Sequence, residues 1–511
     1  MNYQDAKKII NAKSWKGLDG PHAALCVSGC VIAACALFLV AHLSSYPIEL
    51  WDESRSAVNA IEMYQSGTSL VTTYEFHPDL WNTKPPLLIW LMAWSMRLFG
   101  PSEWALRLPS AAAAVATLAV VMGFTWRLTR SIPTTVLACM LLFASPGFFG
   151  YHAAATGDYD ALLCFFTTAY VCLLFFILHR RRPKPWRILI AGALVAAAVL
   201  TKGVAGLLPG VGIAVYLVAT RRWSRPFLSP WYLVSGIAVV LVAVSFFGLR
   251  ELAGRGYLAA VMSNDLGGRY FRTIGKHSGA LWYYVFRAGG FKFSAGPLVF
   301  LAPFGLIVAS RSRVRLGLLY SLCIVVGLLI TLSLGATKLP WYLIPAYPFQ
   351  AISLAIATQL FIRKAAKEAR WSSLRVRAIQ IGVLVLAFFL ALSWRVIIFQ
   401  HDYHRDEPQA KYDALFESLS RQGIHDVTIV DAGVSNTEGL VNYSPQLRFY
   451  ALLWSAKKLK VHDILPDLTT LPNHTGAVIA TCDPRWGDTV SRLGHEIGAV
   501  SGCVAVFYQE R

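Results

Sequence analysis

Apolar residues fall into long runs along this chain, separated by short polar and basic segments. A helix needs about 20 apolar residues to cross the hydrocarbon core of a bilayer. Eleven runs approach that length, so the pattern predicts a polytopic α-helical membrane protein with about eleven or more transmembrane helices. The expected helices lie near residues 23–44, 103–126, 132–150, 159–179, 188–201, 203–220, 231–249, 295–310, 314–335, 341–362 and 377–399.

The last part of the chain has a different pattern. The segment HDVTIVDAG alternates apolar and polar residues and ends in turn formers, as a strand does, and GAVIATCD and GCVAVFYQ are similar. KYDALFESLSRQG has the spacing of an amphipathic helix. We therefore expect a transmembrane domain over 1–399 and a small soluble α/β domain over 400–511, in which nothing looks catalytic.

Composition supports the membrane assignment. The 511 residues are 56% hydrophobic and only 15% charged, whereas soluble domains have roughly 25% charged residues. The net charge of +19 is uneven, because the tail from His401 has 14 acidic and 10 basic residues. A basic membrane part predicts cytoplasmic anchoring loops and an anionic lipid substrate. Nucleic acid is disfavoured, since the basic residues lie in short loops between apolar runs.

The basic clusters also predict the topology. With eleven spans, six Lys/Arg clusters fall on one side, which the positive-inside rule assigns to the cytoplasm. The opposite side then receives loops 45–100 and 251–294 and the tail, where Cys482 and Cys503 either form a disulfide or remain free. The six clusters are Lys7–Lys16, Arg127–Arg130, Arg180–Arg187, Arg221–Arg225, Arg311–Arg315 and Arg363–Arg377.

Ionisable residues gather on the predicted non-cytoplasmic side. The first apolar run is followed by WDESR, with Asp52, Glu53 and Arg55, and the same loop continues to NTKPPLLIW with Lys84. Carboxylates beside cations suit transfer of a group from an anionic lipid: cations bind the leaving phosphate, and a carboxylate orients or deprotonates the acceptor. The further polar residues on this side are Asp158, Asp160, Lys202, Asn264, Arg269, Arg272, Lys276, His277, Lys338 and Tyr342.

Each of these residues also has a structural interpretation. Asp52 and Glu53 fit surface carboxylates beside Arg55, and Lys84 and Lys202 fit interfacial lysines whose ammonium groups reach water. Asp158 fits a helix N-cap, a role that does not exclude catalysis. Their gathering on one predicted side favours the functional interpretation.

Four motifs carry a resemblance to a known family. They are the acidic pair after the first span, Lys-Pro-Pro at Lys84–Pro86, Thr-Lys-Gly at Thr201–Gly203, and the run Lys338–Pro345. In order and spacing they resemble the GT-C glycosyltransferases of the dolichyl-phosphate-mannose protein mannosyltransferase superfamily. The resemblance covers roughly residues 20–400 and is strongest to the bacterial branch that includes the 4-amino-4-deoxy-L-arabinose lipid A transferase, which also has a periplasmic C-terminal domain.

The resemblance implies roles for individual residues. Asp52 matches the catalytic carboxylate of the family, Asp158 a second acidic position, and Glu53 completes the expected catalytic set. No metal is expected to be required, because Lys and Arg suffice to neutralise a phosphate. The residues expected at the donor phosphate are Arg55, Lys84, Lys202, Arg269, Lys338 and Tyr342.

The implied function is an inverting glycosyl transfer in the bacterial inner membrane. An undecaprenyl-phosphate sugar is the expected donor, and lipid A is the first acceptor considered, approached from the periplasmic side. Protein or polysaccharide glycosylation by the same fold is the alternative, followed by a lipid-linked sugar transporter and a sensor or scaffold. Thr83 stands where the lipid A branch often has an acidic residue before the Lys-Pro-Pro lysine, so the sugar stays open.

Overall fold

The structure is a computed structural model. It describes residues 20–68, 70–150, 152–224, 229–268, 270–273, 277–290, 292–310, 312–400, 408–434, 442–457, 459–469, 471, 476–500 and 502–509. The chain forms two compact units. The helical unit comprises the described residues of Met1–His42, Thr83–Leu88 and Ser110–Gln400. The loop-and-tail unit comprises those of Leu43–Asn82, Ile89–Pro109 and His401–Arg511.

Helical structure is present in all eleven runs that the sequence predicts, within the described residues. Eight of the described helices are long and apolar enough to cross a membrane, which makes the chain a multi-pass membrane protein. The helices of this part are α2 (Pro21–Ala41), α5 (Glu103–Thr129), α6 (Ile132–Phe143), α7 (Pro146–Phe149), α8 (Tyr159–Leu178), α9 (Pro185–Lys202), η1 (Gly203–Leu207), α10 (Pro209–Ala219), α11 (Trp231–Ala253), α12 (Tyr257–Val261), η3 (Met262–Leu266), α13 (Tyr283–Ala288), η4 (Gly296–Phe304), α14 (Gly305–Val308), α15 (Ser312–Leu334), η5 (Pro340–Ala346), α16 (Tyr347–Glu368) and α17 (Ser373–Gln400).

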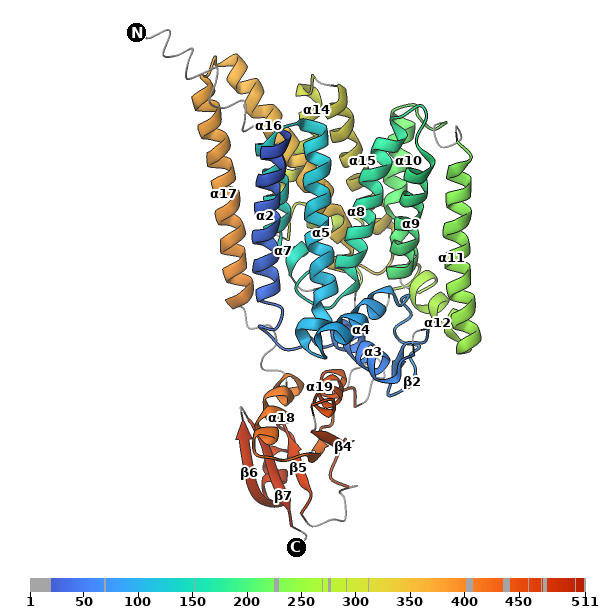
Figure 1. Cartoon of the computed structure of the whole chain (residues 1–511), viewed down its shortest axis with the longest axis vertical. Coiled ribbons are helices and arrows are strands. Elements are labelled where there is room, and N and C mark those ends of the chain that lie inside the picture. The colour runs from blue at the N-terminus through green and yellow to red at the C-terminus, as the bar shows by residue number, and fades with distance from the viewer. Residues whose placement is uncertain are drawn as a thin grey trace. The chain divides into compact units, whose positions relative to one another are not determined.

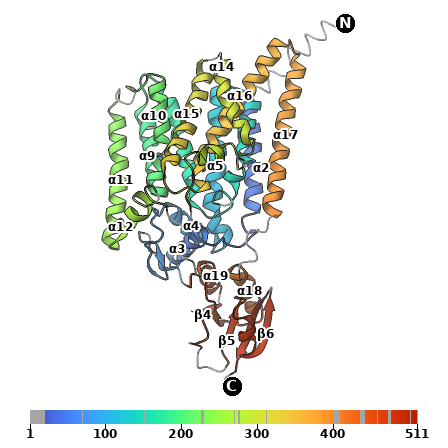
Figure 2. The same ribbon diagram turned by 180° about the vertical axis from the view of Figure 1, so that it is seen from behind.

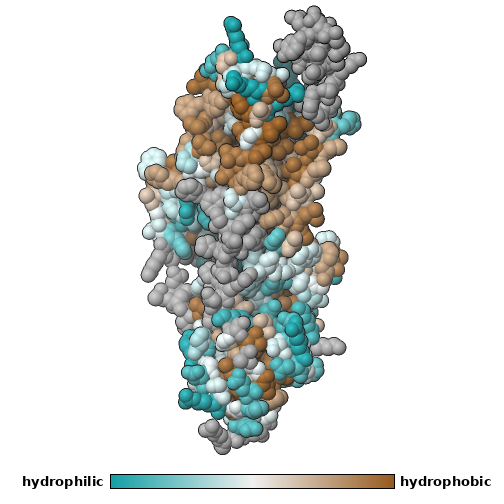
Figure 3. Space-filling view, turned by 90° about the vertical axis from the view of Figure 1, so that its left-hand side faces the viewer, coloured by the Kyte–Doolittle hydropathy of each residue, from teal (hydrophilic) through white to brown (hydrophobic). Residues whose placement is uncertain are grey.

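The long helices of the helical unit run alongside one another (Figures 1 and 2). α6 packs against α16, α17 and α2, and α9 packs between α8 and α11. Many apolar side chains of these helices stay exposed, and Figure 3 shows a broad hydrophobic surface over this unit. On α17 the exposed residues include Ile381, Leu386, Phe388 and Phe389. Such a surface is expected where helices face lipid.

The loop-and-tail unit combines the first loop with the C-terminal sheet. The loop contains α3 (Asp52–Ser66) and the two-stranded β1 (Thr73–Tyr74) and β2 (His77–Pro78), and α4 (Leu87–Phe99) follows, with residues in both units. The tail contains η6 (Pro408–Lys411), α18 (Tyr412–Arg421), β3 (Asp426–Val430), α19 (Pro445–Ser455), β4 (Lys460–Leu465), β5 (Val478–Thr481), α20 (Gly487–Ser491), β6 (Gly494–Val500) and β7 (Cys503–Tyr508).

The tail is the small α/β domain that the sequence predicts. Its strands have the order β4-β3-β5-β7-β6, with β3 parallel to both of its neighbours and β7 antiparallel to both of its own. Val430, Ile479, Val490 and Val506 form its buried core. Cys482 and Cys503 form a disulfide, which settles the question that their spacing left open. The division of the chain at residues 399 and 400 stays a prediction.

Candidate functional site

The WDESR segment forms the start of α3. Trp51 has a φ of 77°, a left-handed conformation that is costly for a non-glycine residue, and it turns the chain into the helix. Asp52 and Glu53 occupy the first helical turn, where the helix dipole stabilises negative charge. Asp52 is half-buried, whereas Glu53 is almost completely buried. Adjacent carboxylates thus have different environments.

Glu53 is bound to Arg107 of α5. The Arg107 Nε and Nη2 atoms lie 2.7 and 2.9 Å from the two carboxylate oxygens of Glu53, and both side chains are inaccessible to solvent. The backbone N–H of Glu49 also donates to Glu53, at 2.8 Å. The guanidinium makes three further bonds, to the carbonyls of Leu43, Tyr46 and Pro47. This geometry gives Glu53 a structural role, and its catalytic role stays a prediction.

Arg55 is bound to Asp79 in the same loop. Its Nε and Nη2 atoms each lie 2.8 Å from an oxygen of Asp79, and its guanidinium lies 3.6 Å from the centre of the Tyr74 ring. Asp79 also accepts bonds from the Asn59 amide and the N–H of Asn82. Burial alone would raise the pKa of Asp79, but these bonds outweigh it and hold the pKa below its ordinary value. The predicted contact of Arg55 with the donor phosphate remains untested.

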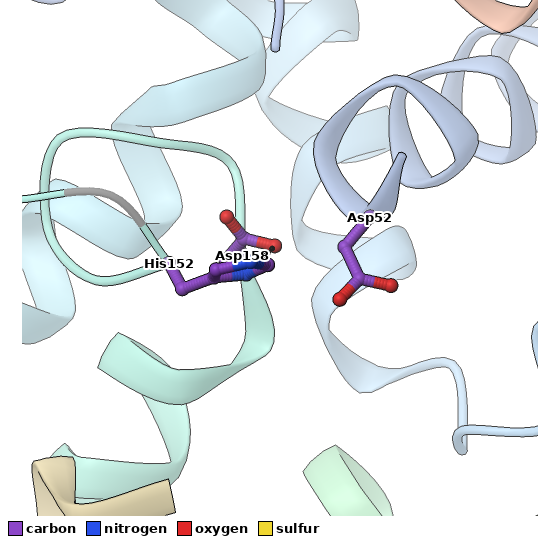
Figure 4. Close-up of side chains that lie close together, drawn as sticks. All are labelled: Asp52, His152 and Asp158. Carbon is purple, nitrogen blue, oxygen red and sulfur yellow. Dashed lines mark ion pairs between the residues drawn. The ribbon is translucent and has the colours of Figure 1, made fainter. Parts of the chain in front are cut away.

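Asp158 and His152 form a buried pair in the helical unit. Asp158 is the N-cap residue of α8, but its side chain makes no capping bond. Instead one oxygen accepts the Thr156 hydroxyl at 2.6 Å, and the other lies 3.4 Å from Nδ1 of His152. Figure 4 shows the imidazole beside the Asp158 carboxylate, and the ring of Trp341 stacks on the imidazole with a centroid distance of 3.8 Å. His152 was not singled out from the sequence, although it lies in the same YHAAATGDYD segment.

His152 also has an unusual backbone. Its φ is 60°, so this residue occupies the left-handed region that few non-glycine residues adopt. The pair offers one carboxylate oxygen and one imidazole nitrogen as ligands for a divalent cation. A zinc site uses three or four protein ligands, so these two alone do not form one. Asp52, drawn in the same figure, belongs to the other unit.

Two predicted lysines of the helical unit lie beside tyrosines. Lys202, at the end of α9, is 2.7 Å from both oxygens of Asp160, and its Nζ lies 5.3 Å from the ring centre of Tyr342. Lys84 lies 5.2 Å from the ring centre of Tyr159. The preceding Thr83 donates its hydroxyl to Asp265 at 2.9 Å. The charge of Lys202 is thus compensated by a buried carboxylate within hydrogen-bond distance.

Lys338 lies just after the end of α15, where the sequence places it. Its ammonium donates to the backbone carbonyls of Leu332, Ser333 and Gly335, where α15 ends. The last carbonyls of an α-helix lack N–H partners in the following turn, and a cation at this end is favoured by the dipole. Lys338 is therefore a C-terminal cap, and its phosphate contact stays a prediction. Arg269 and Lys276 lie outside the described residues.

The geometry can be compared with known proteins. Residues 83–248 match the family profile described as dolichyl-phosphate-mannose-protein mannosyltransferase. A relative from Enterobacter sp. (strain 638), named undecaprenyl phosphate-alpha-4-amino-4-deoxy-L-arabinose arabinosyl transferase, is 26% identical over 61% of this chain and 56% of its own length. A protein of the same name from Edwardsiella ictaluri (strain 93-146) is 24% identical over 70% of this chain and 65% of its own length. The chain thus spans less than two thirds of the length of these relatives.

A solved structure extends the similarity to nearly the whole chain. The crystal structure of ArnT from Cupriavidus metallidurans bound to undecaprenyl phosphate matches with a TM-score of 0.71 and 17% identity, over 95% of this chain and 98% of that one. At this identity the match concerns the fold. The resemblance drawn from the sequence motifs is confirmed, as is the predicted fold class.

Proposed function

We propose that this chain, which has the fold of the GT-C membrane glycosyltransferases, transfers a sugar from a polyprenyl-phosphate donor to an acceptor on the periplasmic side of the inner membrane. The names of the two relatives support undecaprenyl phosphate as the lipid carrier and an aminoarabinose-type sugar as the first to test. Lipid A is the acceptor that we test first. The basic clusters of the sequence support the orientation.

The observation that carries this proposal is that the three charged residues of WDESR have different environments. Glu53 and Arg55 are each bound to a buried partner, Arg107 and Asp79. These two ion pairs fix the first turns of α3 and present Asp52 as a half-buried carboxylate on a rigid frame. A carboxylate held by a fixed support is what positioning of a nucleophile requires.

The proposed reaction is a displacement at the anomeric carbon of the sugar. The acceptor oxygen forms a new bond to that carbon as the bond to the polyprenyl-phosphate oxygen breaks, which inverts the configuration. The bonding electrons leave with the phosphate, so cations near it lower the barrier. Lys84 is the cation that we place at this phosphate first, with Arg55, Lys202, Arg269 and Lys338 as further candidates.

Asp52 acts on the acceptor, in a way that depends on the acceptor's chemistry. A phosphate on lipid A is already anionic at neutral pH, so Asp52 would orient it. A hydroxyl must lose its proton, so Asp52 would accept that proton as a general base. Asp158 is the second carboxylate of the proposed site, and Tyr342 is proposed to contact the donor.

The experiment is mass spectrometry of lipid A from the source bacterium. The gene is deleted, restored, and restored as Asp52→Asn, with expression of each protein measured. We expect a mass of one sugar to disappear on deletion and to return only with the unaltered gene. Unchanged lipid A in all strains would reject this acceptor, and the same strains would then be compared for glycoproteins and surface polysaccharide.

A further inference from the structure

The tail holds the first loop at Ile48, four residues before Asp52. The backbone N–H of Ile48 donates to the hydroxyl of Tyr450 at 2.9 Å, and its carbonyl accepts the side-chain amide of Gln446 at 2.5 Å. The Tyr450 hydroxyl donates in turn to Glu103. All these residues belong to the loop-and-tail unit. Both backbone polar groups of Ile48 are therefore satisfied by α19.

A second set of contacts joins the tail to the middle of α3. α19 packs against α3 (Figure 1). Arg448 of α19 lies 3.5 Å from the carboxylate of Glu62 and 3.3 Å from that of Glu75. Glu62 is completely buried and also accepts the N–H groups of Glu75 and Phe76, at 2.8 and 3.0 Å. The tail thus binds the helix of Asp52 as well as the segment before it.

The third contact is aromatic and lies next to Asp52. The buried ring of Tyr443 stacks on Trp51 with a centroid distance of 5.7 Å, and on Tyr74 at 6.2 Å. The guanidinium of Arg55 lies against the same rings, 3.6 Å from the centre of Tyr74 and 5.8 Å from that of Tyr443. Tyr443 of the tail therefore lies against both Trp51 and Arg55, the residues that flank Asp52–Ser54 in the sequence.

From these contacts we infer that Tyr443 is a positioning residue for Asp52, and that the C-terminal domain is part of the active enzyme. The left-handed backbone of Trp51 is a strained conformation, which persists only where surrounding contacts hold it. The Tyr443 ring supplies such a contact. Without it Trp51 is held less tightly, and Asp52, the next residue, shifts with it, although the two ion pairs still hold Glu53 and Arg55. A displacement of about 1 Å is enough to lower a rate by about a hundredfold. The inference rests on the proposed function of Asp52.

The test uses the full-length protein with an undecaprenyl-phosphate-linked aminoarabinose and purified lipid A. Tyr443→Ala should lower kcat by about ten- to a hundredfold, because the Asp52 carboxylate is no longer held in its position. Tyr443→Phe keeps the stacked ring and should retain nearly full activity. Phe507→Ala, which alters a partly exposed aromatic residue of the same domain, is the matched control. Equal kcat for Tyr443→Ala and the unaltered protein would overturn the inference.

Folding and function are separated by two further measurements. If Tyr443→Ala does not yield folded protein, Tyr443→Leu replaces it, because leucine retains apolar volume without a flat face and should show the same fall in kcat. Hydrogen–deuterium exchange of residues 46–55 reports the held segment directly. Faster exchange in this segment, with the control unchanged, is expected, and unchanged exchange overturns the inference. Absent turnover by the unaltered protein would reject the proposed substrates, while the exchange result would still decide whether Tyr443 holds the segment.

Discussion

Arg107 and Glu53 form a buried, two-bonded ion pair between α5 and α3, although they are 54 positions apart in the sequence. Both side chains are inaccessible to solvent, and the remaining guanidinium bonds go to three backbone carbonyls of the segment before α3. The pair therefore fixes the first turn of the helix, and with it the segment that presents Asp52. The two neighbouring carboxylates can be distinguished by experiment.

The Glu53 pair should matter for stability. Removing one partner of a buried ion pair leaves an uncompensated charge and costs about 3–5 kcal/mol. We expect Arg107→Met to lower the thermal midpoint of the detergent-purified protein strongly. Glu53→Gln together with Arg107→Met should recover part of the loss, because no unpaired charge remains. An unaltered midpoint in Arg107→Met would contradict the structural role of the pair.

Asp52→Asn should lower activity but leave the thermal midpoint nearly unchanged, unlike the changes at Glu53 and Arg107. A first-turn carboxylate contributes only about 0.3–1 kcal/mol through the helix dipole, so the thermal midpoint should change little. Activity should fall, by about 10²-fold or more if the acceptor is a hydroxyl that needs a general base, and by less if it is a phosphate. Initial rates with each acceptor class separate these cases. Full activity in Asp52→Asn would remove this residue from the proposed mechanism.

The long transmembrane helices could be predicted from the sequence because a membrane span needs a long apolar run, which one sequence displays directly. The helices α3 (Asp52–Ser66) and α19 (Pro445–Ser455) contain no such run, and they are not predicted from the sequence. The strands β3, β5 and β7 have buried, β-branched patterns and were also predicted. The strands β4 (Lys460–Leu465) and β6 (Gly494–Val500) lie at the two sheet edges and alternate less clearly, so the sequence does not predict them.

The candidate residues could be found from the sequence, but their partners could not. Asp52, Glu53 and Arg55 are recognisable as charges next to an apolar run. The partners Arg107 and Asp79 are distant in the sequence, and no spacing rule connects them to WDESR. A lysine just after a helix is a known cap pattern, so the sequence also contains a signal for the contacts that Lys338 makes at the end of α15. Its phosphate contact stays a prediction.

Replacing Lys84 should affect donor binding, whereas replacing Lys202 should affect the stability of the protein. A charge-assisted hydrogen bond contributes about 1.5–3 kcal/mol, so Lys84→Ala should raise the donor KM by about tenfold or more if it binds the phosphate. Lys202→Met should instead destabilise the protein, because Asp160 is buried and loses its cation.

The control is the double variant Lys202→Met with Asp160→Asn, which should regain much of the thermal midpoint. If Lys202→Met keeps the original midpoint but raises the donor KM, Lys202 belongs with the phosphate ligands as its motif predicts. A normal KM in Lys84→Ala would contradict the role that we propose for Lys84.

The disulfide should stabilise the C-terminal domain. Cys482 follows β5 and Cys503 begins β7, and the two residues are 21 positions apart. Closing a loop of this length contributes about 3 kcal/mol in the chain-entropy model. We expect Cys482→Ser together with Cys503→Ser to lower the midpoint at which the tail unfolds, and reductant to do the same to the unaltered protein. Reductant should leave the midpoint of the double variant unchanged.

Asp79 should make the first loop sensitive to acid. Its pKa is lowered in the folded protein, so the folded state favours the ionised form more strongly than the unfolded chain does. The resulting stability is present above the pKa of an unfolded aspartate, about 3.9. It is lost as the pH falls from there through the lower folded value, when Asp79 becomes protonated and Arg55 loses its partner.

The measurement compares thermal midpoints between pH 7 and pH 3. The unaltered protein should lose stability in the acid part of this range. The double variant Asp79→Asn with Arg55→Gln removes both charges, so it should start lower at pH 7 and decline less steeply below pH 4. Other carboxylates also titrate between pH 3 and pH 7. The contribution of the Arg55–Asp79 pair is therefore the difference between the two curves of thermal midpoint against pH. Parallel curves would mean that the Arg55–Asp79 pair contributes no pH-dependent stability, and that the neighbouring rings alone hold the guanidinium in place.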